Sequence, residues 1–153
     1  MHTRCETHME LVFREVPWDD LDPFETRDYI APRPAGFLRS AIVAEFQSER
    51  IKAWECRDNA RVVGRCVASL QTGEILFVGV LPNYEDLGIG KSLLASACQW
   101  LRANGATRVW LQTFPDPGLR SYGFYRAVGW RPTGERTEDG DEILEYPIAP
   151  PRP

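Results

Sequence analysis

Three β-rich runs follow one another between Ile51 and Pro82, and they constrain the fold more than any other feature of the chain. The runs are IKAWECR, RVVGRCVASL and EILFVGVLP, separated only by short polar turns at Asp58-Asn59 and Thr72-Gly73. Such short turns join antiparallel neighbours, whereas parallel neighbours need a much longer crossover. The middle of the chain therefore predicts an antiparallel meander and excludes a sheet in which strands and helices alternate throughout.

The segments on either side of this meander predict a mixed α+β domain. Strands are predicted over 10–16 and in TRVWLQTF (107–114), and a final hairpin over 130–148 turns at Asp139-Gly140. Helices are predicted from residue 17, over 37–47, over 90–105 and over 118–129. We expect one mixed, mostly antiparallel sheet of about seven strands, flanked by about four helices.

Length and composition predict one globular domain over 1–153, with a loose proline-rich tail at 148–153. The four cysteines are scattered, which predicts reduced thiols. The chain shows no secretory apolar segment, which predicts a cytoplasmic protein. It also shows no run of about 20 apolar residues, so no membrane contact is predicted. A net charge of -4 without a basic stripe argues against nucleic-acid binding. The two histidines have no ligand spacing, so no metal site is predicted.

The stretch YEDLGIGKSLL (84–94), between the third run and the longest predicted helix, is the candidate functional loop. Glycines let backbone N–H groups converge on a ligand, and the helix that begins near Gly88 adds unsatisfied donors, which together favour phosphate. A Walker A loop requires glycine where Glu85 stands, and a dinucleotide fingerprint requires it at Leu93. The loop predicts phosphate binding outside both motifs, with an empty strand-to-helix turn as the alternative.

Two segments in this order resemble the GNAT superfamily of acyl-CoA N-acyltransferases. FVGVLPNYEDLGIGKSLL resembles the family's motif A, in which a strand ending V-x-P leads through a glycine turn into a long helix, and FYRAVGW (124–130) resembles motif B. The element order matches over nearly the whole chain, which implies a GNAT-type fold. Glu85 departs from the family's usual Gln or Arg, Gly118 from a frequent Asn, and Trp130 from Phe.

The resemblance implies an acyltransferase that moves an acetyl group from acetyl-CoA directly to a primary amine of a small molecule or peptide. The alternative is a catalytically weak CoA-binding sensor or scaffold with the same fold. By resemblance the protein is a monomer or a homodimer. The acids and aromatics of the first two predicted helices suit a cationic amine, although acids early in a helix also form an ordinary solvated face. They are Trp18, Asp19, Asp20, Asp22, Glu25, Tyr29 and Arg33.

The resemblance also assigns roles to particular residues. The strand end, the glycine loop and the following helix would bind the cofactor through Val78, Val80, Leu81, Glu85, Asp86, Leu87, Gly88, Ile89, Gly90, Lys91, Ser92 and Tyr122. A backbone N–H near Val80 or Leu81 would polarise the thioester carbonyl. A glycine inside this strand, Gly79, predicts a bulge or a close ligand approach, with a small residue that packs under a helix as the alternative.

Two residues are the catalytic candidates. Tyr125 aligns with the general-acid tyrosine of the family. A phenol suits this role, because it is protonated at neutral pH and can donate its proton to a departing thiolate. Tyr122 is its rival, three residues earlier. Glu74, at the start of its strand, is the candidate general base, with Asp116 or a chain of water molecules as alternatives.

Overall fold

The structure is a computed structural model, and it describes residues 9–17, 48 and 50–147. The described residues form a seven-stranded sheet in the order β1-β2-β3-β4-β5-β7-β6. The strands are β1 (Leu11–Glu15), β2 (Ile51–Asp58), β3 (Arg61–Ser69), β4 (Glu74–Val80), β5 (Trp110–Thr113), β6 (Arg131–Arg136) and β7 (Glu142–Glu145). Within this sheet β4 and β5 pair in parallel, and the other neighbours are antiparallel.

The predicted α+β class and the mixed, mostly antiparallel sheet are therefore confirmed. Two predicted helices correspond to α2 (Ile89–Ala103) and α3 (Arg120–Ala127), and a short 3-10 helix, η2 (Pro82–Tyr84), precedes the glycine loop. The helices predicted from residue 17 and over 37–47 lie outside the described residues. None of the helices in the described ranges is long and apolar enough to cross a membrane.

The meander forms because its turns suit tight reversal. Gly73, in the turn between β3 and β4, has φ 76°, and its N–H donates to the Ser69 carbonyl at 2.9 Å. A Cβ at this position would lie 2.0 Å from the Arg108 carbonyl oxygen. Glycine therefore permits both the turn and the close passage of the chain that leads into β5.

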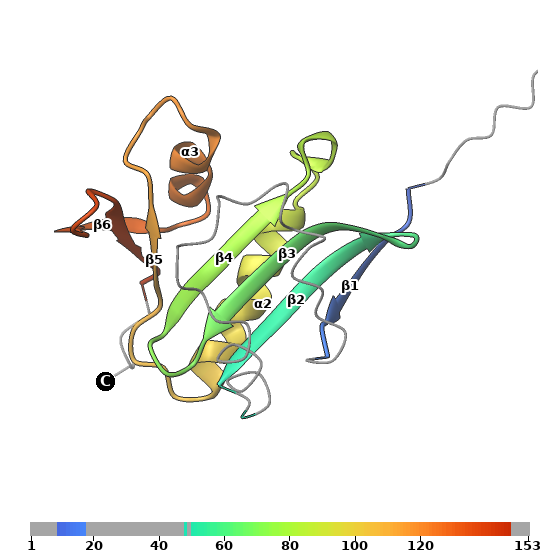
Figure 1. Ribbon diagram of the computed structural model, residues 1–153, viewed down its shortest axis with the longest axis horizontal. Helices are drawn as coiled ribbons and strands as arrows, with labels where there is room; N and C mark the ends of the chain where they lie inside the picture. The colour runs from blue at the N-terminus through green and yellow to red at the C-terminus, as the bar shows by residue number, and fades with distance from the viewer. Residues whose placement is uncertain (1–8, 18–47, 49, 148–153) are drawn as a thin grey trace, which may run out of the picture.

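Helix α2 covers one face of the strands β2, β3 and β4 (Figure 1). Its apolar residues repeat at helical spacing, and Leu93, Ala97 and Leu101 are buried against the sheet, as the sequence predicts. Trp100 lies at the edge of this core and makes an edge-to-face contact with Trp54, with ring centroids 5.6 Å apart. The long helix is thus held to the sheet along its whole length.

The opposite face of the sheet carries a buried charge cluster. Glu55 is fully buried and accepts from Arg14 and Arg57 at 2.6 Å each and from Arg65 at 3.2 Å. Burial alone raises the pKa of a carboxyl, but the three guanidinium groups hold the pKa of Glu55 below its usual value. Glu55 therefore stays ionised as the centre of an ion-pair network.

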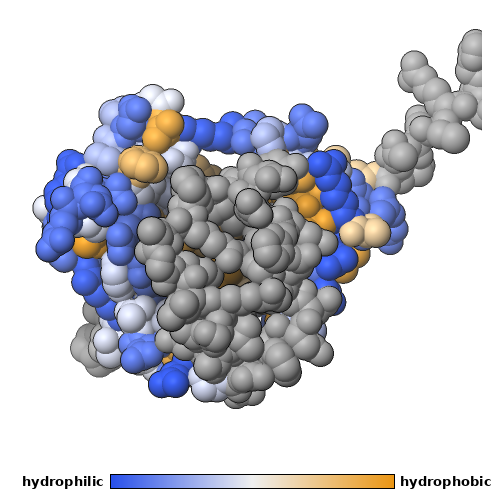
Figure 2. All heavy atoms as spheres, in the orientation of Figure 1, coloured by the Kyte–Doolittle hydropathy of each residue, from blue (hydrophilic) through white to orange (hydrophobic). Residues whose placement is uncertain are grey.

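On the face shown in Figure 2, the coloured residues at the rim are mostly hydrophilic, with apolar residues gathered near the β1 edge and near α3. The exposed large apolar residues of the described ranges lie before and on β1, on β4, in the glycine loop and in the connection between β5 and α3. They are Met9, Val12, Phe13, Leu76, Leu87, Phe114 and Leu119.

Candidate active site

The strands β4 and β5 separate soon after they meet, and this separation positions the site. Their pairing comprises the single register pair Glu74 and Trp110, whereas β5 pairs with β7 along its whole length. Figure 1 shows β5 leaving the side of β4 toward the end that carries the glycine loop. Among the residues that the structure describes, the edge of β4 beyond Glu74 therefore has no strand partner on the β5 side.

The hydrogen bonding of β4 decides which backbone groups face this open edge. The Leu81 N–H donates to the Val63 carbonyl on the β3 side at 2.8 Å. Along an antiparallel strand, residues alternate between facing one neighbour and facing the other. Val80 and Val78 therefore direct their backbone groups toward the β5 side. Of the two amides that the sequence suggested for the thioester carbonyl, Leu81 is already engaged, and Val80 remains.

A cleft of about 300 Å³ opens at this edge. It lies between β4, the glycine loop and α3, and its lining includes nine of the predicted site residues. They are Val78, Val80, Glu85, Asp86, Gly88, Ile89, Gly90, Lys91 and Tyr125. Leu81, Leu87, Ser92, Tyr122 and Glu74, which the sequence also suggested, do not line it.

The start of α2 supplies unsatisfied donors to the cleft. Gly88 is the N-cap residue with φ 79°, and no side chain caps the helix. The Ser92 N–H donates to the Gly88 carbonyl at 3.0 Å, which is the first bond of the helix. The N–H groups of residues 89–91 precede this bond and have no helical acceptor. Together with the positive end of the helix dipole they form an anion-binding concavity.

The two glycines of the loop serve different purposes. A Cβ at Gly88 would meet nothing within 4 Å, so the left-handed backbone is the reason for glycine there. A Cβ at Gly90 would lie 3.0 Å from Cζ of Phe124 and 3.6 Å from Cγ2 of Val80. Gly90 therefore lets α2 begin in direct contact with α3 and with the end of β4.

The acidic residues of the loop are paired across the cleft. Arg120, the first residue of α3, places Nε 2.9 Å from Oε2 of Glu85 and Nη2 2.6 Å from Oδ1 of Asp86. The hydrogen bond that Arg120 donates to Asp86 and the charge of both acids raise the pKa of Arg120. The unfavourable charge that Glu85 brings to a phosphate site is thus offset by a cation on the opposite wall.

Tyr125 lies on the buried side of α3 and lines the cleft. It is 8% exposed and packs against Phe124 and Trp130, with ring centroids at 5.3 Å and 6.3 Å. Burial raises the pKa of its phenol above the usual value, so the hydroxyl stays protonated at neutral pH. Its rival Tyr122 is instead stacked under the guanidinium of Arg126, 3.5 Å from the ring centre, and outside the cleft lining.

Glu74 lies at the closed end of the separation between β4 and β5. Its Oε1 accepts from Nε2 of Gln112 at 3.0 Å. Burial raises the pKa of Glu74, and the Gln112 hydrogen bond partly opposes this effect. Glu74 is about 13 Å along the strand from Val78, at 3.3 Å per residue. The alternative base Asp116 caps its own loop by accepting from the Gly118 N–H at 2.9 Å.

Gly79 lines the cleft but does not form the predicted bulge. The register of β3 and β4 is irregular between Val67 and Ala68, opposite residue 76 of β4. A Cβ at Gly79 would lie 2.5 Å from Cζ of Phe77, so glycine makes room for that ring. This ring belongs to β4 itself and not to a helix, and because Gly79 lines the cleft, a close approach of the ligand there stays a prediction.

Sequence reasoning missed four cleft residues, namely Tyr84, Arg120, Ser121 and Phe124. Tyr84 donates its hydroxyl to Oδ2 of Asp58 at 2.5 Å, which fixes the loop to the turn between β2 and β3. The acid in the loop indicates that a cation must lie nearby, but no local pattern identifies it as Arg120, which is 34 positions from Asp86.

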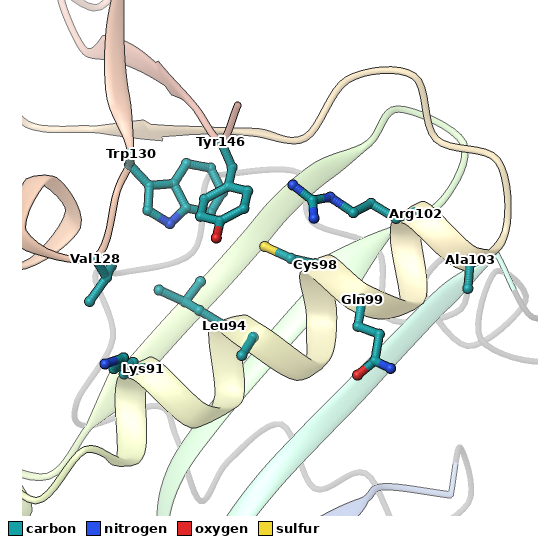
Figure 3. A pocket seen from close by; sticks show the side chains of 10 residues that line it. Lys91, Leu94, Cys98, Gln99, Arg102, Ala103, Val128, Trp130 and Tyr146 are labelled. Carbon is teal, nitrogen blue, oxygen red and sulfur yellow. The ribbon is translucent and has the colours of Figure 1, made fainter. Parts of the chain in front are cut away.

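A second cavity of about 510 Å³ lies between α2 and the β6–β7 end of the sheet. Figure 3 shows Leu94 and Cys98 of α2 pointing toward Trp130 and Tyr146 across it. Lys91 is shared with the smaller cleft, but the glycine loop, Tyr125 and the open edge of β4 are not part of it. The larger cavity therefore lacks the converging backbone N–H groups and the general-acid candidate Tyr125, which make the smaller cleft a candidate active site. Within the described residues, no cluster of three or more His, Cys, Asp or Glu side chains is arranged to hold a metal ion.

A glycine-rich helix start, the adjacent open strand edge and a buried tyrosine on the next helix define the architecture of an acyl-CoA acyltransferase. The model of the acetyltransferase (GNAT) family matches residues 12–130. The chain belongs to this family, and the resemblance seen in the sequence is confirmed. No curated protein sequence matches the chain significantly.

Solved structures share the fold at low sequence identity. The PaiA N-acetyltransferase from Thermoplasma acidophilum, in complex with coenzyme A, matches with a TM-score of 0.68 and 18% identity, covering 92% of this chain and all (100%) of that one. A GNAT family acetyltransferase from Elizabethkingia anophelis with acetyl-CoA bound matches with a TM-score of 0.65 and 12% identity, over 90% of this chain and 98% of that one. The ribosomal-protein-S18-alanine N-acetyltransferase from Escherichia coli matches with a TM-score of 0.60 and 18% identity, over 93% and 97%.

Proposed function

We propose that the protein is an N-acetyltransferase that transfers the acetyl group of acetyl-CoA to a primary amine of a small molecule or peptide. The observation that carries this proposal is the cleft at the open edge of β4, because it joins outward-facing backbone groups, an uncapped helix start and Tyr125. The complexes of similar folds with coenzyme A and acetyl-CoA support the choice of donor.

Two parts of the cleft bind the donor in this proposal. The N–H groups at the start of α2 bind the pyrophosphate, whose negative charge the helix dipole stabilises. The outward-facing groups of Val78 and the carbonyl of Val80 pair with the amides of the pantetheine arm, as a neighbouring strand would, which leaves the Val80 N–H for the thioester. The donor thus occupies the edge of β4 that β5 leaves open.

Transfer joins the amine nitrogen to the carbonyl carbon of the thioester and breaks the carbon–sulfur bond. The Val80 N–H stabilises the oxyanion that forms at the carbonyl, an effect worth on the order of a hundredfold in rate. Tyr125 gives its proton to the departing sulfur, and because burial raises the pKa of its phenol, the hydroxyl carries that proton at neutral pH. Glu74 takes the proton of the amine through water, since it does not line the cleft.

The acceptor is the least defined part of the proposal. The acids and aromatics between Trp18 and Arg33 that suit a cationic amine lie outside the described residues. Similarity to the ribosomal-protein-S18-alanine N-acetyltransferase supports a peptide amine as one acceptor class. We further propose a cytoplasmic location, with which the three buried thiols Cys56, Cys66 and Cys98 are compatible.

A CoA-binding sensor or scaffold is the second candidate, and the distance of Glu74 from the cleft favours it. Release of free CoA from acetyl-CoA is measured across a panel of amines, amino acids and peptides, alongside the melting temperature with and without acetyl-CoA. Acceptor-dependent release supports the enzyme. A raised melting temperature without release for any acceptor supports the sensor. No thermal shift with acetyl-CoA or longer acyl-CoAs contradicts donor binding altogether.

A further inference from the structure

Arg120 forms ion pairs with two acids across the mouth of the cleft. These three charged side chains lie where the phosphates of the proposed donor would bind. The two acids, Glu85 and Asp86, belong to the loop that precedes α2, while Arg120 begins α3 on the facing wall. All three residues line the cleft together with Gly88 and Lys91. The cation and the acids are therefore placed where the donor's phosphates would enter.

The guanidinium has donors to spare for a phosphate. Its Nε and Nη2 atoms are paired with the carboxylates, and no hydrogen bond within the described residues uses Nη1. A guanidinium carries five N–H donors in a planar fork, so it can hold two carboxylates and a phosphate oxygen at once. The Arg120 side chain is 53% exposed, which leaves its free edge accessible to a ligand.

The charge count shows why these ion pairs matter. Glu85 and Asp86 bring two negative charges to the loop, and without Arg120 they would repel an anionic ligand held by the nearby amides. A compensating cation therefore has to come from outside the loop, and Arg120 is the side chain that contacts both acids.

We propose that Arg120 is a phosphate-binding residue for the donor, which keeps Glu85 and Asp86 paired while its remaining N–H groups bind a donor phosphate. The inference rests on the proposed function, because it assumes a CoA donor. It assigns Arg120 the task of positioning the donor and gives it no part in the proton transfers. Glu85 then weakens donor binding, and Arg120 offsets that effect.

The test measures the dissociation constant of CoA by calorimetry for the wild type, Arg120→Gln, Arg120→Lys and Glu85→Gln. Arg120→Gln is expected to weaken binding at least tenfold, because it removes a phosphate contact and exposes two acids. The CoA dissociation constant of Arg120→Lys is expected to lie between those of the wild type and Arg120→Gln, since lysine keeps the charge but loses the planar fork. Glu85→Gln is expected to bind CoA a few-fold tighter than the wild type, because it removes a negative charge from the loop.

Arg108→Gln is the matched control, because Arg108 also bridges two carboxylates, Glu145 at 2.9 Å and Glu135 at 3.0 Å, outside the cleft. Its CoA affinity should equal that of the wild type. Melting temperatures check that every variant is folded. With an active acceptor, Arg120→Gln should raise the KM for acetyl-CoA and leave kcat nearly unchanged.

Two outcomes separate the inference from the proposed function. If the wild type does not bind CoA, the donor assignment itself is wrong. If the wild type binds CoA and Arg120→Gln binds it equally well, the role of Arg120 is wrong and the donor assignment stands. Titration with dephospho-CoA, which lacks the 3′-phosphate, identifies the phosphate that Arg120 binds. If Arg120→Gln weakens the binding of dephospho-CoA as much as that of CoA, Arg120 binds the pyrophosphate. If the wild type and Arg120→Gln bind dephospho-CoA equally well, Arg120 binds the 3′-phosphate, and both results are consistent with the proposal.

Discussion

Gly64 determines how closely α2 approaches the sheet, and its replacement by alanine tests whether this approach positions the glycine loop. A Cβ at residue 64 would lie 2.8 Å from Cγ2 of Ile89 and 3.1 Å from Cδ1 of Leu93. Both side chains are 1% exposed, so neither has open space to move into. The new methyl group must therefore push the start of α2 away from β3.

Overpacking of this kind costs about 2 kcal/mol of the free energy of unfolding, which corresponds to a fall in melting temperature of about 4–8 °C for a chain of this size. Because Ile89 is the first residue of α2, the displacement also moves the N–H groups of the loop. We therefore expect Gly64→Ala to weaken acetyl-CoA binding as well as to lower stability. Thermal denaturation followed by circular dichroism and a titration with acetyl-CoA measure the two effects.

Gly123→Ala is the control, since it makes the same chemical change in the interior of α3. A Cβ at Gly123 would meet nothing within 4 Å, so alanine should stabilise the helix by about 0.5–1 kcal/mol. The two variants should thus shift the melting temperature in opposite directions. A Gly64→Ala protein as stable as the wild type would refute the packing argument, and normal acetyl-CoA binding in a destabilised variant would refute the link to the loop.

Two further predictions concern the chemistry. Tyr125→Phe should lower kcat by on the order of a hundredfold while the CoA dissociation constant stays unchanged, because only the acid is lost; an undiminished kcat would contradict the acid role. Glu74→Gln should remove the acidic limb of the pH–rate profile, on which activity rises as the carboxyl loses its proton. Since burial raises the folded-state pKa of Glu74, the ionised carboxyl costs stability above that pKa and nothing below the unfolded value. The same variant should therefore gain melting temperature near pH 7, with a gain that disappears on acidification, and a gain independent of pH would contradict the assigned cause.

Local patterns sufficed for most of the described architecture. The short turns at Asp58-Asn59 and Thr72-Gly73 fixed antiparallel pairing, because no longer connection was available to the chain. The buried stripe of Leu93, Ala97 and Leu101 follows from helical periodicity alone. These features depend on residues close together in the sequence, where spacing is informative.

Features that depend on register or on distant contacts could not be predicted. The engagement of the Leu81 N–H follows from how β4 is aligned with β3, which the strand sequences do not specify. The irregularity opposite residue 76, instead of at Gly79, has the same origin. The pairing of Arg120 with Asp86 joins residues 34 positions apart, and no local pattern indicates it.

Glu85 shows why matching residues one by one misjudges an electrostatic site. An anion responds to the charges within a few ångströms, whichever segment supplies them, because Coulomb energy depends on distance and local polarity. The family's usual Gln or Arg at this position brings no negative charge to the loop. Here the loop is negative, and α3 supplies the compensating guanidinium at 2.9 Å. An unusual residue at one motif position is therefore evidence against phosphate binding only after the charges on the facing wall of the cleft have been included. In this protein the facing wall carries the positive charge of Arg120.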